Sequence, residues 1–143
     1  IRAGGTAKLL STDKGEAINS SVRISAGRSR GWGWLFGEFL NTVKLNKQIS
    51  VNVSPKIALS GIGNPSAVGT SLNWELIPGI FLIPESNFSI NDAQNNWTLA
   101  IRFSSSEDKF LDIYTTNSLS FIDAGQLMRA KQQSYGINIG TIF

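Results

Sequence analysis

The sequence predicts an all-β protein that folds as an antiparallel up-and-down β-barrel of about eight to ten strands. Three observations support this fold class. Apolar and polar residues alternate with a period of two along most of the chain. The alternating runs are roughly nine to twelve residues long, whereas soluble strands usually have about five or six. Polar segments with turn-forming residues separate the runs, as hairpin connections require. A soluble β-sandwich is the alternative, because it shows the same alternation.

The clearest pair of strands is Gln48–Ser60 and Val68–Leu76. In the first, every odd position from 49 to 59 is apolar, and the positions between carry Ser, Asn, Lys or Ala. The connecting segment Gly61–Ser66 is rich in turn formers. This stretch therefore predicts a β-hairpin.

Further strands follow from the same pattern. Two segments, Trp32–Leu40 and Ile80–Ile83, are apolar at successive positions and are predicted as strands with two apolar faces. The polar segment Glu85–Asn96 is predicted in part as a loop. Four segments alternate: Ile18–Ala26, Trp97–Phe103, Phe110–Thr115 and Tyr135–Phe143.

Residues Phe121–Gln133 have apolar positions that fit a short amphipathic helix, but a strand or a linker fits as well. The organisation of the chain is open in a second way. Residues 1–143 form either one complete barrel domain or the C-terminal part of a larger barrel.

The composition excludes several classes of chemistry. The chain has no Cys and no His, so disulfides, thiolate or imidazole metal ligands and Ser-His or Cys-His catalysis are excluded. Its net charge of +3 is too small for a nucleic-acid-binding face. The carboxylates Glu107 and Asp108 lie in a segment that reads as a solvated turn. We therefore expect no catalytic residues, no metal, no cofactor and no nucleic-acid partner, and the protein is not expected to be an enzyme.

Alternation alone does not say which face of the strands meets water. The polar face is rich in small uncharged residues, whereas soluble sheets usually present Lys and Glu. A narrow lumen suits small side chains and a few charges of both signs. Long strands also favour a closed barrel, which has no free edges. The in-strand charges predicted to line a lumen are Arg23, Lys56, Glu75, Arg102 and Asp112.

Aromatic residues near strand ends are typical of the interfaces of a membrane-spanning barrel. Trp32 and Trp34, next to Arg28 and Arg30, offer two interpretations: interfacial anchors, which we favour, or a platform for a sugar or an anion. The predicted aromatic girdle consists of Trp32, Trp34, Trp74, Trp97, Tyr135 and Phe143.

The last strand resembles the C-terminal strand of Gram-negative outer-membrane β-barrel proteins, which alternates apolar residues and ends in Phe. The matching residues are Tyr135, Gly136, Ile137, Ile139 and Phe143, and Thr141 departs from the apolar phase. The resemblance implies a bacterial outer-membrane location. It also implies that this strand is an assembly signal, read by the barrel-assembly machinery.

Two functions from different classes follow. The first is a non-enzymatic outer-membrane β-barrel with a structural, adhesive or porin- or export-like role, surrounded by outer-membrane lipid. The second is a soluble periplasmic or secreted β-sandwich whose loops bind a carbohydrate or a protein. The two differ in what covers the apolar face: lipid in the first, a second sheet in the other.

Overall fold

The computed structural model describes residues 2–10, 18–29, 31–61, 63–91, 95–106, 109–119 and 123–141. In these ranges the chain forms one antiparallel sheet in which each strand pairs with the next along the sequence. The strands are β1 (Arg2–Leu10), β2 (Asn19–Ser29), β3 (Trp32–Lys44), β4 (Ile49–Ser60), β5 (Ser66–Ile77), β6 (Ile80–Ser89), β7 (Asn96–Ser106), β8 (Lys109–Ser118) and β9 (Arg129–Thr141). The predicted all-β, up-and-down antiparallel fold is confirmed.

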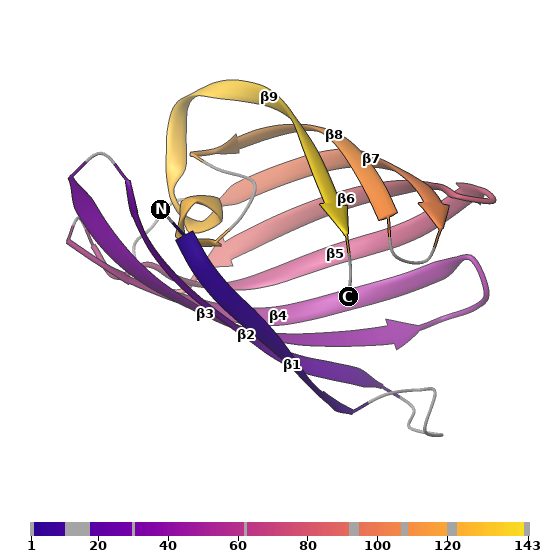
Figure 1. Ribbon diagram of the computed structural model, residues 1–143, viewed down its shortest axis with the longest axis horizontal. Coiled ribbons are helices and arrows are strands. Elements are labelled where there is room, and N and C mark those ends of the chain that lie inside the picture. Colours follow the sequence, from indigo (N-terminus) through magenta and orange to yellow (C-terminus); the bar gives the residue numbers. More distant parts are fainter. Residues whose placement is uncertain are drawn as a thin grey trace.

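The sheet curls into a half-barrel with one concave and one convex face (Figure 1). Within the described residues β1 pairs only with β2 and β9 only with β8, so these two strands form the edges. Strand β6 extends to Ser89, and the predicted loop after Glu85 is therefore shorter than the sequence indicated. No helix of the described residues is long and apolar enough to cross a membrane.

The segment predicted as helix, strand or linker divides into two elements. Asp123–Leu127 forms a short 3-10 helix, η2, and β9 begins at Arg129. η2 lies inside the curve of the sheet, where it contacts β3, β4, β6 and β8 (Figure 1). We call this end of the sheet the η2 end. The β3–β4 and β5–β6 turns lie at the opposite end, which we call the turn end.

Tight turns explain the two best-defined hairpins. Residues Leu45–Gln48 join β3 to β4, and the Asn46 side chain accepts hydrogen bonds from the backbone N–H groups of Gln48 and Ile49 at 2.8 Å each. Pro78 and Gly79 join β5 to β6, and Gly79 has a φ of 79°, a conformation that favours glycine. The long strands therefore reverse direction within a few residues, which keeps neighbouring strands in register.

Candidate functional site

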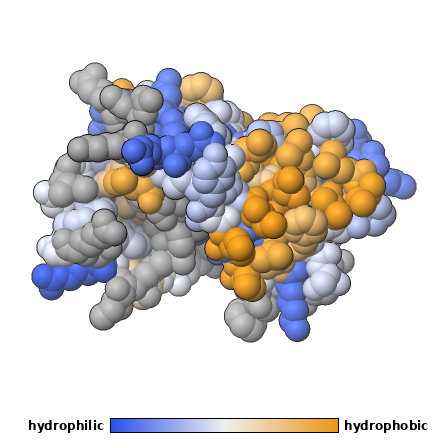
Figure 2. Space-filling view, turned by 90° about the horizontal axis from the view of Figure 1, so that it is seen from above, coloured by the Kyte–Doolittle hydropathy of each residue, from blue (hydrophilic) through white to orange (hydrophobic). Residues whose placement is uncertain are grey.

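The two faces of the sheet have the reverse of the usual soluble arrangement. Residues directly opposite each other on neighbouring strands share a face. One such row runs through Trp74, Leu82, Ile101, Ile113 and Ile137, from β5 to β9, on the convex face. The large apolar side chains that are exposed on this face are Ile24, Leu35, Phe39, Val43, Val53, Ile57, Leu59, Trp74, Leu76, Phe88, Trp97, Leu99, Ile101, Phe103, Ile113, Tyr135, Ile137 and Ile139. In Figure 2 many apolar side chains gather into a large patch on the right-hand side of the view.

The concave face contains a chain of alternating charges that crosses the strands. Arg23, Glu38 and Lys56 are directly opposite one another on β2, β3 and β4. The Arg23 guanidinium lies 2.6 Å from Glu38 Oε2, and Lys56 Nζ lies 3.3 Å from Glu38 Oε1. Lys56 Nζ also donates to Glu85 Oε1 on β6 at 2.6 Å. Each buried charge of this network therefore faces an opposite charge, as its burial requires.

A glycine on β5 makes the contact between Lys56 on β4 and Glu85 on β6 possible. Lys56 reaches from β4 to β6 by crossing over Gly69, where a Cβ would lie only 2.5 Å from Lys56 Cε. A larger residue at position 69 would obstruct the path of the ammonium group to Glu85. Lys56 Nζ also donates to Gln126 Oε1 of η2 at 2.6 Å, so the ammonium group joins three separate elements.

A second charged cluster lies nearer the turn end. Arg102 on β7 binds Asp112 on β8 through two hydrogen bonds, Nε to Oδ1 at 2.7 Å and Nη2 to Oδ2 at 3.0 Å. Asn138 on β9 donates to Asp112 Oδ2 at 3.3 Å. The guanidinium carbon lies 4.1 Å from the centre of the Phe110 ring. Asp112 is fully buried, and these donors hold its carboxylate in one position.

Glu75 completes the set of five charges predicted to line a lumen. It is in register with Phe81 and, through Phe81, with Arg102, so it lies on the concave face. Its Oε1 accepts a hydrogen bond from the Gly79 backbone N–H at 3.1 Å. All five residues, Arg23, Lys56, Glu75, Arg102 and Asp112, thus lie on the concave face, in two clusters rather than one.

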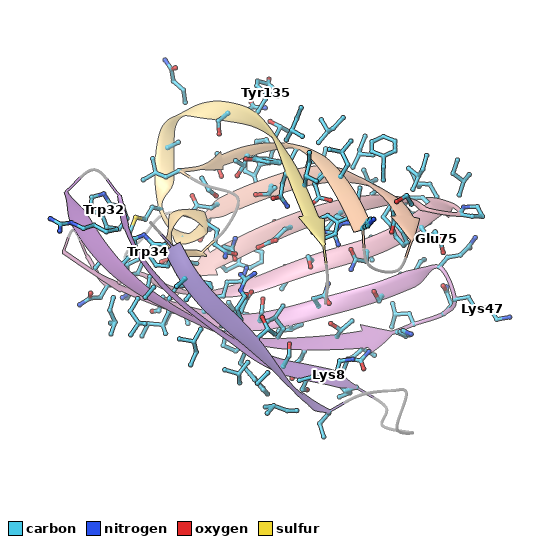
Figure 3. All side chains as sticks on the ribbon, viewed as in Figure 1. Lys8, Trp32, Trp34, Lys47, Glu75 and Tyr135 are labelled. Atoms are coloured by element: carbon cyan, nitrogen blue, oxygen red, sulfur yellow. The ribbon has the colours of Figure 1, made fainter. Side chains whose placement is uncertain are left out.

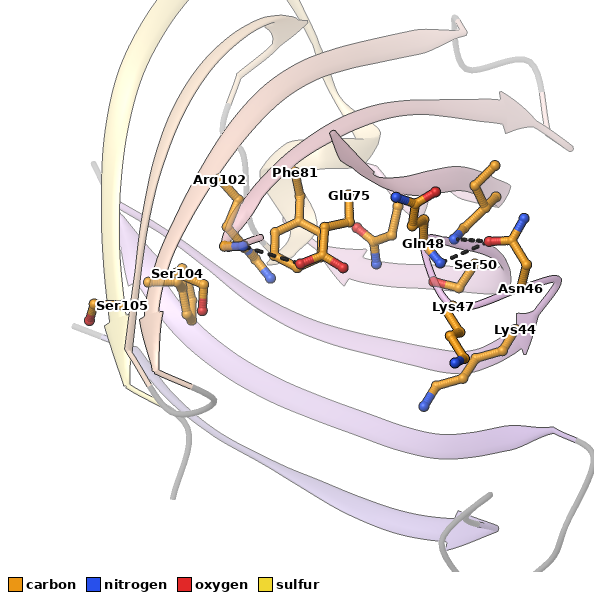
Figure 4. Close-up of a pocket in the computed structure, with 14 residues that line it drawn as sticks. Lys44, Asn46, Lys47, Gln48, Ser50, Glu75, Phe81, Arg102, Ser104 and Ser105 are labelled. Carbon is orange, nitrogen blue, oxygen red and sulfur yellow. Dashed lines mark hydrogen bonds between the residues drawn. The ribbon is translucent and has the colours of Figure 1, made fainter. Parts of the chain in front are cut away.

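A cavity of about 510 Å³ opens at the turn end of the concave face (Figure 4). Glu75, Phe81 and Arg102 line one side of it, and Lys44 lies on the other. Phe110 also lines the cavity. It offers aromatic rings, charges of both signs and polar side chains. Among the described residues, no cluster of three or more Asp, Glu, His or Cys is placed to hold a metal ion.

The predicted girdle residues divide between the two faces. Trp74, Trp97 and Tyr135 lie exposed on the convex face, and Figure 3 shows Tyr135 pointing away from the enclosed space. Trp32 and Trp34 instead share the phase of Phe36, and Trp34 packs against the buried cluster around that residue. The placement of these two differs from the expected outward anchors, because β3 alternates Trp34, Phe36 and Glu38 inward. Phe143 lies outside the described residues.

The residues of the predicted assembly signal have two kinds of environment. Tyr135, Ile137 and Ile139 point outward at the β9 edge and are the most exposed large side chains of the convex face. Gly136 lies on the concave face opposite Tyr114, whose ring occupies the space that a Cβ would need. Phe143 of this signal is again outside the described residues.

Three partners of Lys56 were not identified from the sequence: Glu38, Glu85 and Gln126. Glu38 lies in the segment that was interpreted as apolar on both faces. A strict period of two through Trp34, Phe36 and Glu38 would have placed it with Lys56. Glu85 follows Pro84 and was assigned to a loop. No pattern in the sequence indicates that Gln126 meets Lys56, because 70 residues separate them.

Comparisons with protein-family models, with curated proteins and with solved structures found no match to this chain.

Proposed function

We propose that this sheet forms the wall of a non-enzymatic β-barrel in a bacterial outer membrane. The convex face would contact lipid, and the concave face would line the lumen. The observation that supports this proposal is the inverted burial: the ion pairs are covered and the large apolar side chains are exposed. In water each exposed apolar side chain would forgo about 25 cal/mol for every Å² left unburied. In a bilayer that cost disappears.

The dimensions of the strands fit this proposal. β7 has 11 residues, which extend about 36 Å along the strand at about 3.3 Å per residue. With a tilt of about 45° it would cover about 25 Å of membrane thickness, close to the height of the apolar band of such barrels. Trp74 lies near the turn end and Trp97 near the η2 end, so aromatic rings occur towards both borders of the apolar face.

Charge distribution supports the same orientation. No charged residue occurs among the side chains of β7 and β4 that point to the convex face, from Trp97 to Phe103 and from Ile49 to Leu59. Charged residues at the middle of a bilayer cost about 2–4 kcal/mol each, so their absence from this face suits lipid contact. The concave face carries the charges, where a lumen would hydrate them or let them pair.

The two edges need partners in lipid, because unpaired backbone groups there cost several kcal/mol each. Eight successive antiparallel pairings make β1 and β9 run in the same direction. The barrel would therefore close either by parallel pairing of β1 with β9 or by an odd number of added strands. The exposed Tyr135, Ile137 and Ile139 at the β9 edge fit the proposed role of this strand in assembly by the barrel-assembly machinery.

The turn-end cavity favours a second candidate function. Phe81 and Phe110 provide apolar ring surfaces beside Arg102 and Glu75, a combination that suits a polar ring such as a sugar. In this candidate the protein is a secreted or periplasmic module that binds carbohydrate. It requires a second protein surface to cover the convex face, and it ranks second for that reason.

Tryptophan quenching by lipid separates the two candidates. Three variants each retain one tryptophan, Trp34, Trp74 or Trp97, with Phe at the other three positions, and are refolded into vesicles with brominated acyl chains. We expect strong quenching of Trp74 and Trp97 and little quenching of Trp34, which packs inside the concave face. If the chain folds in buffer without lipid, and Trp97 in vesicles fluoresces as in unbrominated lipid, the membrane proposal is wrong.

A further inference from the structure

The short helix η2 occupies one end of the concave face. Ala124 and Leu127 are 1% and 3% exposed, and they pack on Phe36, Ala58 and Ala67 of β3, β4 and β5. These small and apolar wall residues form a seat on a face that is otherwise mostly polar. We call Phe36, Ala58 and Ala67 the seat of η2; these residues come from three strands that are distant from η2 in the sequence.

Polar contacts hold the middle of η2 to the wall. Gln126 accepts a hydrogen bond from Lys56 Nζ at 2.6 Å through its side chain. Its backbone carbonyl accepts from Asn96 Nδ2 at 3.4 Å and from Ser118 Oγ at 3.3 Å. Gln126 is thus the residue through which η2 contacts the charge network around Lys56.

The contacts of η2 are separable from those of the sheet. Backbone hydrogen bonds between neighbouring strands hold the sheet together, and no strand pairing among the described residues includes residues 123–127. Three buried atoms around η2, namely Gln126 Nε2, Asn87 Oδ1 and Asn96 Oδ1, have no hydrogen-bond partner among the described residues. Incomplete pairing lowers the net contribution of these contacts to stability, and the strand pairings do not depend on η2.

The two ends of the concave face differ in what they contain. The turn end holds the cavity of about 510 Å³, whereas at the other end η2 lies across the concave face in contact with β3, β4, β6 and β8. A path along the concave face that starts in the cavity therefore meets η2 before it reaches the other end.

We propose that η2 is a plug, and that small inorganic ions pass along the concave face only when η2 leaves its seat. This inference rests on the proposed function, because it requires a closed barrel in a membrane. Displacement of η2 would uncover Lys56, which belongs to a network of two cations, Arg23 and Lys56, and two carboxylates, Glu38 and Glu85. The balanced charges imply similar permeability to K⁺ and Cl⁻.

Conductance in planar bilayers tests the plug. The full chain and the variant Gln126→Ala are inserted from detergent and recorded in KCl. Gln126→Ala removes the side-chain contact with Lys56 and leaves every strand residue unchanged. The matched control is Gln133→Ala, which removes an exposed glutamine that donates to Thr115 on β8. We expect the wild type and the control to stay mostly closed, and the open fraction of Gln126→Ala to rise at least tenfold.

Thiol accessibility gives a second measurement, and the cysteine-free chain provides a clean background. Ala67→Cys lies under η2, and Asn73→Cys lies on the same face of β5 at the turn-end cavity. Reaction of Ala67→Cys with a water-soluble maleimide should accelerate at least tenfold when Gln126→Ala is added. The rate for Asn73→Cys should stay the same.

The outcomes separate the two proposals. Insertion is checked first by lipid quenching of Trp97, and a chain that does not insert contradicts the proposed function. If the chain inserts but Gln126→Ala matches Gln133→Ala in conductance and Ala67→Cys reacts at an unchanged rate, the plug is wrong and the membrane barrel stands. A wild type that conducts freely with Ala67→Cys protected also overturns the plug.

Discussion

The two faces of strand β7 differ sharply in the exposure of their side chains. Trp97, Leu99, Ile101 and Phe103 point to the convex face and are each about two-fifths exposed. Thr98 and Ala100, which alternate with them, are 5% and 1% exposed. Both sets belong to the same strand and the same strand pairings. Whether a side chain of β7 is exposed therefore depends only on which face of the sheet it points to.

The comparison shows that each face satisfies a different requirement. On the concave face charges are buried, and each must be matched by an opposite charge or a hydrogen bond. In β7 the convex side chains from Trp97 to Phe103 are all apolar or aromatic, and the requirement there is that the medium be apolar. A substitution should therefore have effects that depend on the face and on the distance from the strand ends.

Removal of Lys56 should have the largest effect. Lys56→Ala leaves Glu38 and Glu85 without their shared cation, and breaking a buried ion pair on one side costs about 3–5 kcal/mol. The free energy of unfolding in detergent, measured by denaturant titration with tryptophan fluorescence, should fall by this amount. The control is Lys47→Ala, an exposed lysine in the β3–β4 turn, which should unfold at the wild-type denaturant concentration. Equal midpoints for the two variants would show that the network contributes nothing to stability.

A charge on the convex face should have the next largest effect. Ile101 is the central residue of β7, so Ile101→Arg should destabilise the protein in vesicles by about 2–4 kcal/mol. Leu76→Arg, next to the last residue of β5, should cost about 0–1 kcal/mol because it lies near the membrane border. Denaturant titration in vesicles measures both. Equal losses of stability at the two positions would contradict a lipid environment on the convex face, because the cost of a charge in a bilayer depends on its depth.

Much of the fold could be predicted from the sequence because the period of two is local. Gln48–Leu76 was assigned as a hairpin, and its two strands pair as β4 and β5. The boundaries were less accurate. The segment from Glu85 to Asn96 was predicted in part as a loop, yet β6 continues to Ser89 because strand pairing with β5 and β7 extends past Glu85.

The candidate site was predictable only in part. Charges in clearly alternating strands, such as Lys56 and Arg102, were placed on the polar face by the period alone. Trp34 and Glu38 were not, because large residues on both sides of β3 hide the period. The contact between Lys56 and Gln126 depends on how a 3-10 helix folds back onto the sheet, and local patterns contain no information about such a long-range contact.

The smallest predicted effects on stability concern two glycines. Replacement by alanine should destabilise the protein at Gly140 on β9 and stabilise it at Gly5 on β1. Gly140 lies on the concave face of β9, where the Phe110 ring from β8 fills the place of a Cβ. Gly140→Ala forces that ring to move and disturbs its stacking on Arg102, so overpacking should cost about 1–3 kcal/mol. Gly5 on β1 has no atom within 4 Å of an added Cβ. Gly5→Ala should therefore stabilise the protein by about 0.4–1 kcal/mol, since alanine restricts the unfolded chain. Denaturant midpoints that move in opposite directions support this account. If both variants are stabilised, the ring of Phe110 does not require a glycine beneath it, and the fit of β9 to β8 is looser than the geometry indicates.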